Sequence, residues 1–449
     1  MELTKFKRLI RKFRSLTLRS SYHPRPEDEP TKKGPAESCQ YSGFSTLPAE
    51  LLENIVSFLE PEDLLSLRLT CNTCYEQTQL YFAALLTEMK LGFSEKSLSK
   101  LEAISQDSRF NRRIQSLRMS PDRSSGVLGG GISWERDLEG YLAIPQPAVQ
   151  RIRDILLSLV SLQSLELTNY TEQYSTEDRI EPCEAIRILT YIIAETGLPL
   201  NSLAIVYRSS PVMDDSYMGI EDLEKPGFLS SMSHIQSLSL ECDKQAVNLD
   251  WLGEIIQAAT SLKSLKFVSY SGSEQGLDNR VWDSIDRCAP LEKIILQNAG
   301  WPAPEPCIQF LRQYRSTLRT LCLQSSYLET PGWSAVLAEL RDNFPVLTNF
   351  KVFLLRQPPG DYRYSVDFYN IPEVPGSACV ELTSFTDIIV DQPAPRKYGT
   401  ELLYCYKRPR HGPIVVGVKY SGPDMKLVLQ EMINYVRVTP LFTPRVTRP

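Results

Sequence analysis

The stretches "LKSLKF" at residues 262–267 and "LEKIIL" at residues 291–296 share a spacing of apolar residues that decides the fold of this chain. In each, apolar residues stand at the first, fourth and sixth positions, giving the pattern L-x-x-L-x-L. The pattern occurs eight times, beginning at residues 114, 162, 200, 235, 262, 291, 318 and 347. The last five starts are 27, 29, 27 and 29 residues apart, which predicts a repeated structural unit.

Helical patterns separate these motifs, at residues 148–160, 183–196, 251–260, 308–316 and 333–344. A short strand followed by a helix, repeated, predicts an α/β solenoid with a parallel sheet and outer helices over residues 91–375. This body resembles an irregular leucine-rich-repeat domain. The Asn or Cys that such repeats carry three places after the last leucine is missing. That place holds Tyr170, Asp243, Tyr270, Ala299, Ser326 and Leu355, so the curvature is not predictable from the family.

The residues between the leucines are candidates for binding a target protein. Side chains alternate along a strand, so the leucines point inward and the intervening residues point outward. The outward residues form a surface of mixed charge, which is either a receptor surface or a solvated face. They include Glu166, Thr168, Glu241, Lys266, Lys293, Gln297, Gln324 and Lys351.

A second, denser apolar stretch, "FSTLPAELLENIVSFLEPEDLLSLRLTC", covers residues 44–71. Pro48 and Pro61 each suit the start of a helix, and a third helical pattern covers residues 75–89. Three short helices in under about fifty residues cannot bury this much apolar surface among themselves. The surplus must dock either on a partner or on the body that follows.

This stretch resembles an F-box motif. The resemblance lies in the Leu-Pro pair, the following Glu-Leu-Leu, the "IVSFL" step and the Pro-x-Asp-Leu segment ending in Cys71, and it covers about residues 44–86. It implies a module at residues 44–90 that binds a Skp-type adaptor and, through it, a cullin–RING ubiquitin ligase. The text "CNTCYEQ" departs from the family in the third helix. Carried over by position, the adaptor-contacting or motif-packing residues are Leu47, Pro48, Leu51, Leu52, Ile55, Leu59, Leu64 and Leu67.

Both ends of the chain differ from the repeats. Within residues 1–43, the first nineteen carry seven basic residues and one acid, with apolar residues at helical spacing. They form either a loose tail or an amphipathic helix for a membrane surface, an acidic partner or organelle import. A Pro- and Ser-rich linker follows. Residues 376–449 read as strands and one helix that cap the solenoid, followed by a tail.

Composition excludes several functions. A net charge of −5 argues against a general nucleic-acid binder, and neither a membrane span nor a secretory signal is expected. The ten cysteines read as reduced thiols, mostly buried, in a cytoplasmic or nuclear protein. Cys71 and Cys74 form a C-x-x-C without a second half, so no metal site is predicted.

No catalytic motif or cofactor motif is present, so we expect no enzyme and no cofactor. The first functional hypothesis is a substrate-recognition subunit of a Skp–cullin–F-box ubiquitin ligase, whose repeats bind an unknown target protein. The alternative is an interaction scaffold that acts without a ligase and is placed at a membrane by its basic N-terminal segment.

Overall fold

The computed structural model describes most of the chain between residues 47 and 440. The described ranges are 47–121, 127–169, 179–207, 220–242, 249–269, 285, 290–357, 364–368, 401–406 and 413–440. The predicted basic N-terminal segment, the linker, the first part of the predicted C-terminal cap (residues 376–400) and most of the C-terminal tail lie outside them. The chain divides into two compact units, one up to Thr78 and one from Gln79, and each is described by itself.

The first unit holds three short helices, α2 (Ala49–Val56), α3 (Pro61–Arg68) and α4 (Asn72–Gln77). Pro48 precedes α2 and Pro61 opens α3, as predicted, because proline has no N–H to lose in a first turn. The thiol of Cys71 accepts a hydrogen bond from the backbone N–H of Cys74 at 3.5 Å and so caps α4.

The predicted third helix over residues 75–89 is interrupted at Thr78 and ends at Leu85, and the predicted range 44–90 extends past Thr78, where the first unit ends. After α4 a separate helix, α5 (Gln79–Leu85), begins the second unit. Met89 lies in strand β1 (Glu88–Gly92), which pairs in parallel with β2 (Ser116–Ser120). The sheet therefore starts one strand before the first recognised motif.

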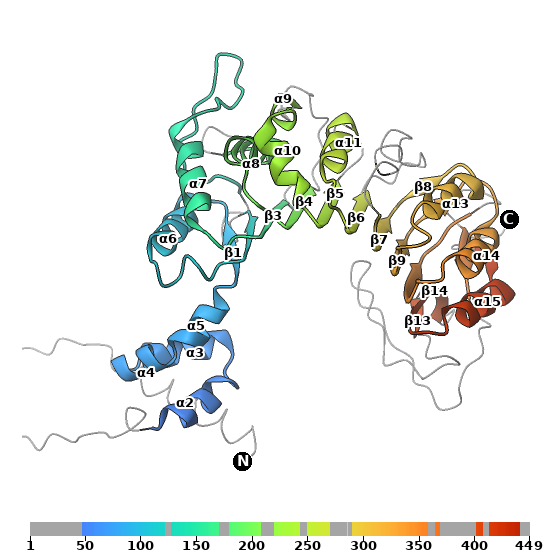
Figure 1. The fold of residues 1–449 in the computed structure, drawn as a ribbon, viewed down its shortest axis with the longest axis horizontal. Coiled ribbons are helices and arrows are strands. Elements are labelled where there is room, and N and C mark those ends of the chain that lie inside the picture. Colours follow the sequence, from blue (N-terminus) through green and yellow to red (C-terminus); the bar gives the residue numbers. More distant parts are fainter. Residues whose placement is uncertain are drawn as a thin grey trace, which may run out of the picture. The chain divides into compact units, whose positions relative to one another are not determined.

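The second unit is built on an eleven-stranded sheet, ordered β1-β2-β3-β4-β5-β6-β7-β9-β11-β14-β13. Its parallel part continues with β3 (Ser164–Asn169), β4 (Ser202–Tyr207), β5 (Ser237–Cys242), β6 (Ser264–Ser269), β7 (Lys293–Gln297), β9 (Thr320–Gln324) and β11 (Asn349–Phe353). In each of the eight motifs, the strand begins two residues after the first apolar residue of the motif. Neighbours in sequence are neighbours in the sheet, as in a solenoid (Figure 1).

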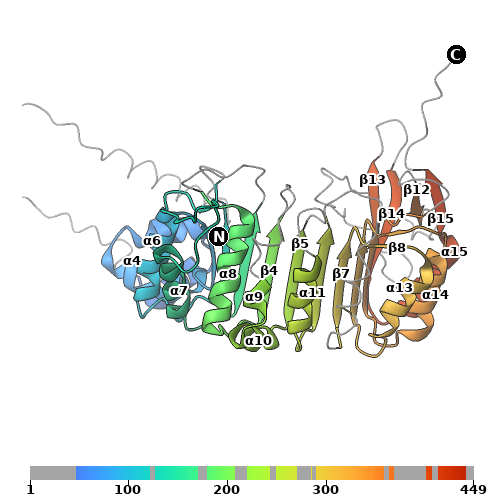
Figure 2. The ribbon, with the colours of Figure 1, turned by 90° about the horizontal axis from the view of Figure 1, so that it is seen from above.

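Helices lie along the outer side of the curved sheet (Figures 1 and 2). They are α6 (Glu95–Gln106), α7 (Pro147–Ser158), α8 (Pro182–Thr196), α9 (Ile220–Leu223), α10 (Pro226–Ser233), α11 (Leu249–Ala258), α13 (Pro304–Arg312) and α14 (Trp333–Asn343). The five helical patterns seen in the sequence are all confirmed. The motif leucines and the inner helix faces form one continuous core.

The solenoid ends in antiparallel pairing. Strand β14 (Pro413–Ser421) pairs with β11 and with β13 (Glu401–Tyr406), and α15 (Met425–Tyr435) packs on α14. Strand β12 (Tyr364–Asp367) pairs with β15 (Arg437–Pro440). The predicted strands and helix beyond residue 400 are therefore present beside the last repeat.

In the last three repeats, a main-chain turn takes the place of the missing Asn. The residue after each strand, Asn298, Ser325 or Leu354, has a left-handed backbone with φ of 50–56°. The N–H of Asn298 donates to the carbonyl of Gln324 at 2.8 Å, and the N–H of Ser325 donates to that of Phe353 at 2.7 Å. Successive repeats are thus joined at this turn by main-chain hydrogen bonds. Just beyond it the short strands β8 (Gly300–Trp301) and β10 (Tyr327–Leu328) pair in parallel.

Candidate functional site

The first unit has a small core of its own. Leu52, Val56, Leu64 and Leu67 are buried together with Cys74. These side chains come from all three helices, so each short helix contributes to holding the other two in place. Helix propensity alone does not stabilise helices of six to eight residues, and packing must do so.

A buried arginine closes this unit at its C-terminal end. The Nη1 of Arg68 donates to the Tyr75 carbonyl at 3.1 Å and to the Thr78 hydroxyl at 3.2 Å, and its guanidinium lies 4.3 Å from the centre of the Tyr75 ring. The Thr78 hydroxyl donates in turn to the Cys74 carbonyl at 2.6 Å. Arg68 thereby fixes α4 against the end of α3. Sequence reasoning did not single out Arg68.

Large apolar side chains remain exposed on the same unit. They are Leu51 (51% exposed), Phe58 (74%), Leu65 (46%), Leu69 (87%) and Tyr75 (38%). Among the described residues eleven large apolar side chains are exposed, and these five fall within 25 residues of one another in sequence. Such a concentration is typical of a surface that a partner covers.

The eight residues predicted for adaptor contact or motif packing divide by exposure. Leu52, Leu64 and Leu67 are buried in the module, Leu47, Ile55 and Leu59 are half-buried, and Pro48 and Leu51 are exposed. Sequence reasoning did not assign Phe58, Leu65, Leu69 or Tyr75 to this site. Phe58 follows the end of α2 at Val56, and apolar spacing alone does not tell an inward from an outward position at so short a helix.

The C-x-x-C pair, Cys71 and Cys74, lies in this unit. Cys74 is buried as predicted, but Cys71 is only half-buried because its thiol caps α4. No group of three potential His, Cys, Asp or Glu ligands occurs within the described ranges. Likewise, none of the described helices is long and apolar enough to span a bilayer.

The face of the sheet away from the helices carries a continuous row of side chains, here called the central row. Each member stands opposite the next across neighbouring strands. In strand order the members are Lys90, Arg118, Glu166, Ala204, Ser239, Lys266, Ile295, Cys322, Lys351 and Lys419. The regular register makes this face one surface assembled from ten strands.

Most of the predicted target-binding residues lie on this face and reach solvent. Lys293 is exposed, whereas Glu166, Lys266, Gln297, Gln324 and Lys351 are half-buried. Thr168 and Glu241 are buried, so their predicted availability is wrong. The Thr168 hydroxyl donates to Glu166 Oε1 at 3.1 Å, and Glu241 forms an ion pair with Lys266. Contacts within the face therefore cover these two side chains.

The charge changes along the central row. Toward the N-terminal end, Arg118 and Glu166 form an ion pair of 2.6 Å. Toward the C-terminal end, Lys266, Lys293 and Lys351 surround the half-buried Cys322. Burial raises the pKa of the Cys322 thiol, and these three ammonium groups act against that rise without overcoming it. The thiol is thus protonated near neutral pH and is no activated nucleophile.

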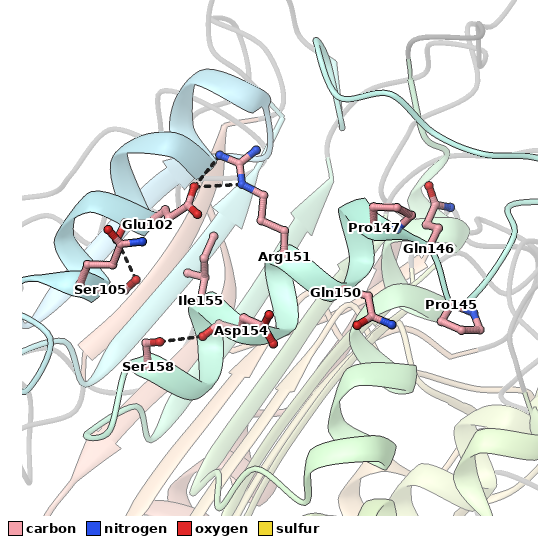
Figure 3. A pocket seen from close by; sticks show the side chains of 11 residues that line it. Glu102, Ser105, Pro145, Gln146, Pro147, Gln150, Arg151, Asp154, Ile155 and Ser158 are labelled. Carbon is pink, nitrogen blue, oxygen red and sulfur yellow. Dashed lines mark hydrogen bonds and ion pairs between the residues drawn. The ribbon is translucent and has the colours of Figure 1, made fainter.

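A groove on the helical side, with a volume of about 610 Å³, lies between α6 and α7 (Figure 3). Arg151 lines it, and its guanidinium binds Glu95 at 2.8 Å and Glu102 at 2.7 Å. These contacts lower the pKa of Glu95 and raise that of Arg151. Because the Arg151 guanidinium is already paired with two carboxylates, the groove is better explained as a contact between two repeats than as a ligand site.

Comparison with known proteins identifies the first unit. The F-box domain family matches residues 44–79. No curated protein matches the chain. Among the solved structures that match is a structural-genomics protein from Bacteroides fragilis, with 12% identity, covering 60% of this chain and 75% of that one at a TM-score of 0.31. The family match shows an F-box domain at residues 44–79, and the strand order shows that a solenoid-like repeat body follows it.

Proposed function

We propose that this chain is the substrate-recognition subunit of a Skp–cullin–F-box ubiquitin ligase. The F-box domain supports a role in protein interactions, and domains of this family bind Skp-type adaptors. The observation that carries the proposal is the exposed apolar set Leu51, Phe58, Leu65, Leu69 and Tyr75. An adaptor that covers these side chains would remove them from water, which is favourable by roughly 25 cal/mol per Å².

The solenoid supplies the second surface that a receptor needs. Its helix-free face presents the central row and the flanking Lys293, Gln297 and Gln324 to solvent. A target held there is tethered to the ligase, so ubiquitin carried by another subunit meets its lysines at a high effective concentration. Acceleration then comes from proximity, and this chain needs no catalytic group of its own.

Co-purification of the full chain with a Skp-type adaptor tests the proposal. The double variant Pro48→Ala/Leu51→Ala and, separately, Phe58→Ser and Leu69→Ser should each lose adaptor. Their thermal unfolding should not change, because these side chains are exposed. Leu138→Ser is the matched control, since Leu138 is a fully exposed leucine of the second unit.

Adaptor retained by all three F-box variants would refute the ligase role. Adaptor lost also by Leu138→Ser would show that the losses are not specific to the F-box. Recruitment of the chain to vesicles through residues 1–43, with no adaptor bound, would instead support the ligase-independent scaffold.

A further inference from the structure

The C-terminal half of the central row concentrates basic side chains. We call Lys266, Lys293, Lys351 and Lys419 the lysine cluster. Lys266, Lys351 and Lys419 belong to the row itself, and Lys293 lies two residues before Ile295, which is Lys266's neighbour in the row. The cluster spans β6 to β14, four strand spacings or roughly 19 Å.

Two of these lysines oppose each other directly. Lys351 of β11 and Lys419 of β14 are partners in an antiparallel pair. Like charges in this position destabilise a sheet, where an acid opposite a base would stabilise it. The pair places two positive charges side by side on this face, where a bound anion would contact both.

Acids on the chain neutralise only part of the cluster. Glu241 pairs with Lys266, and the register sets Glu401 of β13 opposite Lys419. Lys293 and Lys351 have no ion-pair partner among the described residues. Within the lysine cluster, these two positive charges therefore remain available for a ligand.

The residues around these charges suit a polypeptide. Gln297 and Gln324 stand opposite each other on β7 and β9 and can both donate to and accept from a peptide backbone. Ile295 and Cys322, also neighbours, offer apolar contact between the lysines. None of these residues is an aromatic ring or an arginine, the groups on which nucleic-acid bases stack.

We infer that the lysine cluster binds an extended segment rich in aspartate and glutamate on the target protein. This rests on the proposed receptor function and names the chemistry that the receptor surface selects. At about 3.3 Å per residue, six extended residues span the roughly 19 Å between Lys266 and Lys419. Carboxylates spaced along such a segment reach Lys293 and Lys351 while its backbone meets the two glutamines.

The test uses the full chain and a fluorescein-labelled octapeptide with six glutamates, with fluorescence anisotropy as the readout. The glutamine version of the octapeptide is the neutral probe. We expect the acidic probe to bind and the neutral probe to bind at least tenfold more weakly. The double variant Lys293→Glu/Lys351→Glu should bind the acidic probe at least tenfold more weakly than the native chain does. Raising the salt concentration should also weaken binding of this probe to the native chain.

Lys96→Glu/Lys100→Glu is the matched control. It reverses two exposed lysines on α6, outside the central row, and changes the net charge equally. Its affinity for the acidic probe should change less than twofold. Thermal unfolding of Lys293→Glu/Lys351→Glu excludes misfolding. The Lys351→Glu change should leave the unfolding temperature unchanged or raise it, because a glutamate opposite Lys419 removes the like-charge pair.

Three outcomes would overturn the inference: no binding of the acidic probe, equal loss in both double variants, or tighter binding of a single-stranded RNA octamer. Adaptor co-purification separates this result from the proposed function. A chain that keeps the adaptor but ignores the acidic probe retains its ligase role without this selectivity. A chain that binds the probe but not the adaptor keeps the receptor surface and loses the ligase role.

Discussion

Arg68 and Thr78 lie ten residues apart in sequence and are joined by a buried hydrogen bond of 3.2 Å from the Arg68 guanidinium to the Thr78 hydroxyl. Thr78 is the last residue of the F-box unit, so the bond fastens the point at which the chain leaves that unit. The same guanidinium binds the carbonyl of Tyr75 at 3.1 Å. One side chain of α3 thus determines where α4 ends.

Replacing this arginine should loosen the F-box without affecting the solenoid. Arg68→Met leaves the Tyr75 carbonyl and the Thr78 hydroxyl without a charged donor, which costs about 1–3 kcal/mol. We expect faster amide hydrogen exchange in residues 61–78 and unchanged exchange in β3 to β9. Arg112→Met, at an exposed position, is the control and should alter neither region.

Adjacent leucines of α2 should respond in opposite ways. Leu52 is 1% exposed and Leu51 is 51% exposed. Leu52→Ala opens a cavity in a small core and should destabilise the F-box by about 2–5 kcal/mol, with loss of adaptor as a consequence. Leu51→Ala should leave stability within about 0.5 kcal/mol and still lose adaptor.

Hydrogen exchange and adaptor co-purification, measured on both variants, check this pair. A Leu51→Ala chain with fast exchange would place Leu51 in the packing of the module. A Leu52→Ala chain with native exchange would show that the F-box core tolerates the cavity.

Much of the solenoid could be predicted from the sequence because each repeat carries its own signal. Burial of the first, fourth and sixth motif residues requires the strand to begin at the same place each time, so the eight strands follow from the pattern. Strand β1 carries no such signal. Its sequence, "EMKLG", lacks the L-x-x-L-x-L pattern, and only its pairing with β2 defines it as a strand.

The site was less predictable, because exposure depends on neighbours that a sequence does not specify. Thr168 and Glu241 follow the same alternation as Glu166 and Lys266, yet contacts on the sheet face bury them. In the first helical segment, apolar spacing did not separate buried Leu52 from Phe58, which follows the end of α2 and is exposed. From the sequence, Arg68 would be expected at the surface. It is buried because the Tyr75 carbonyl and the Thr78 hydroxyl accept its hydrogen bonds.

A buried ion pair beyond β2 should be among the most sensitive sites of the solenoid. Glu184, at the start of α8, is 2% exposed, and Arg136 binds both its oxygens, at 2.5 and 3.0 Å. Arg136→Met would leave the carboxylate buried without its partner and should cost about 3–5 kcal/mol. Chemical denaturation of the full chain measures this.

The matched control for that variant is Arg153→Met, whose pair with Asp154 lies at the surface. It should cost less than about 1 kcal/mol. Equal losses in the two variants would mean that the Arg136 pair is not held in a buried environment. The double variant Arg136→Met/Glu184→Gln should recover part of the stability, because the unpaired charge is removed as well.

The join between α6 and α7 should weaken in acid. The Arg151 hydrogen bonds lower the pKa of Glu95 in the folded chain, so the ionised form stabilises the fold. This contribution is complete above the ordinary glutamate pKa and is lost as the pH falls through the lowered folded value. In the Glu95→Gln variant, the free energy of unfolding should therefore fall less steeply as the pH is lowered. The exposed control Glu139→Gln should not change this dependence.

Thiol reactivity should distinguish two described cysteines that the sequence cannot rank. The backbone N–H of Cys74 donates to Cys71 and lowers the pKa of the Cys71 thiol, whereas complete burial raises that of Cys307. Because the thiolate is the nucleophile, iodoacetamide near neutral pH should modify Cys71 first and leave Cys307 intact. Mass spectrometry of the folded chain measures the order, and urea should equalise the two rates. Equal rates in the folded chain would mean that Cys71 does not cap α4, whereas Cys71→Ser should keep the cap through its hydroxyl.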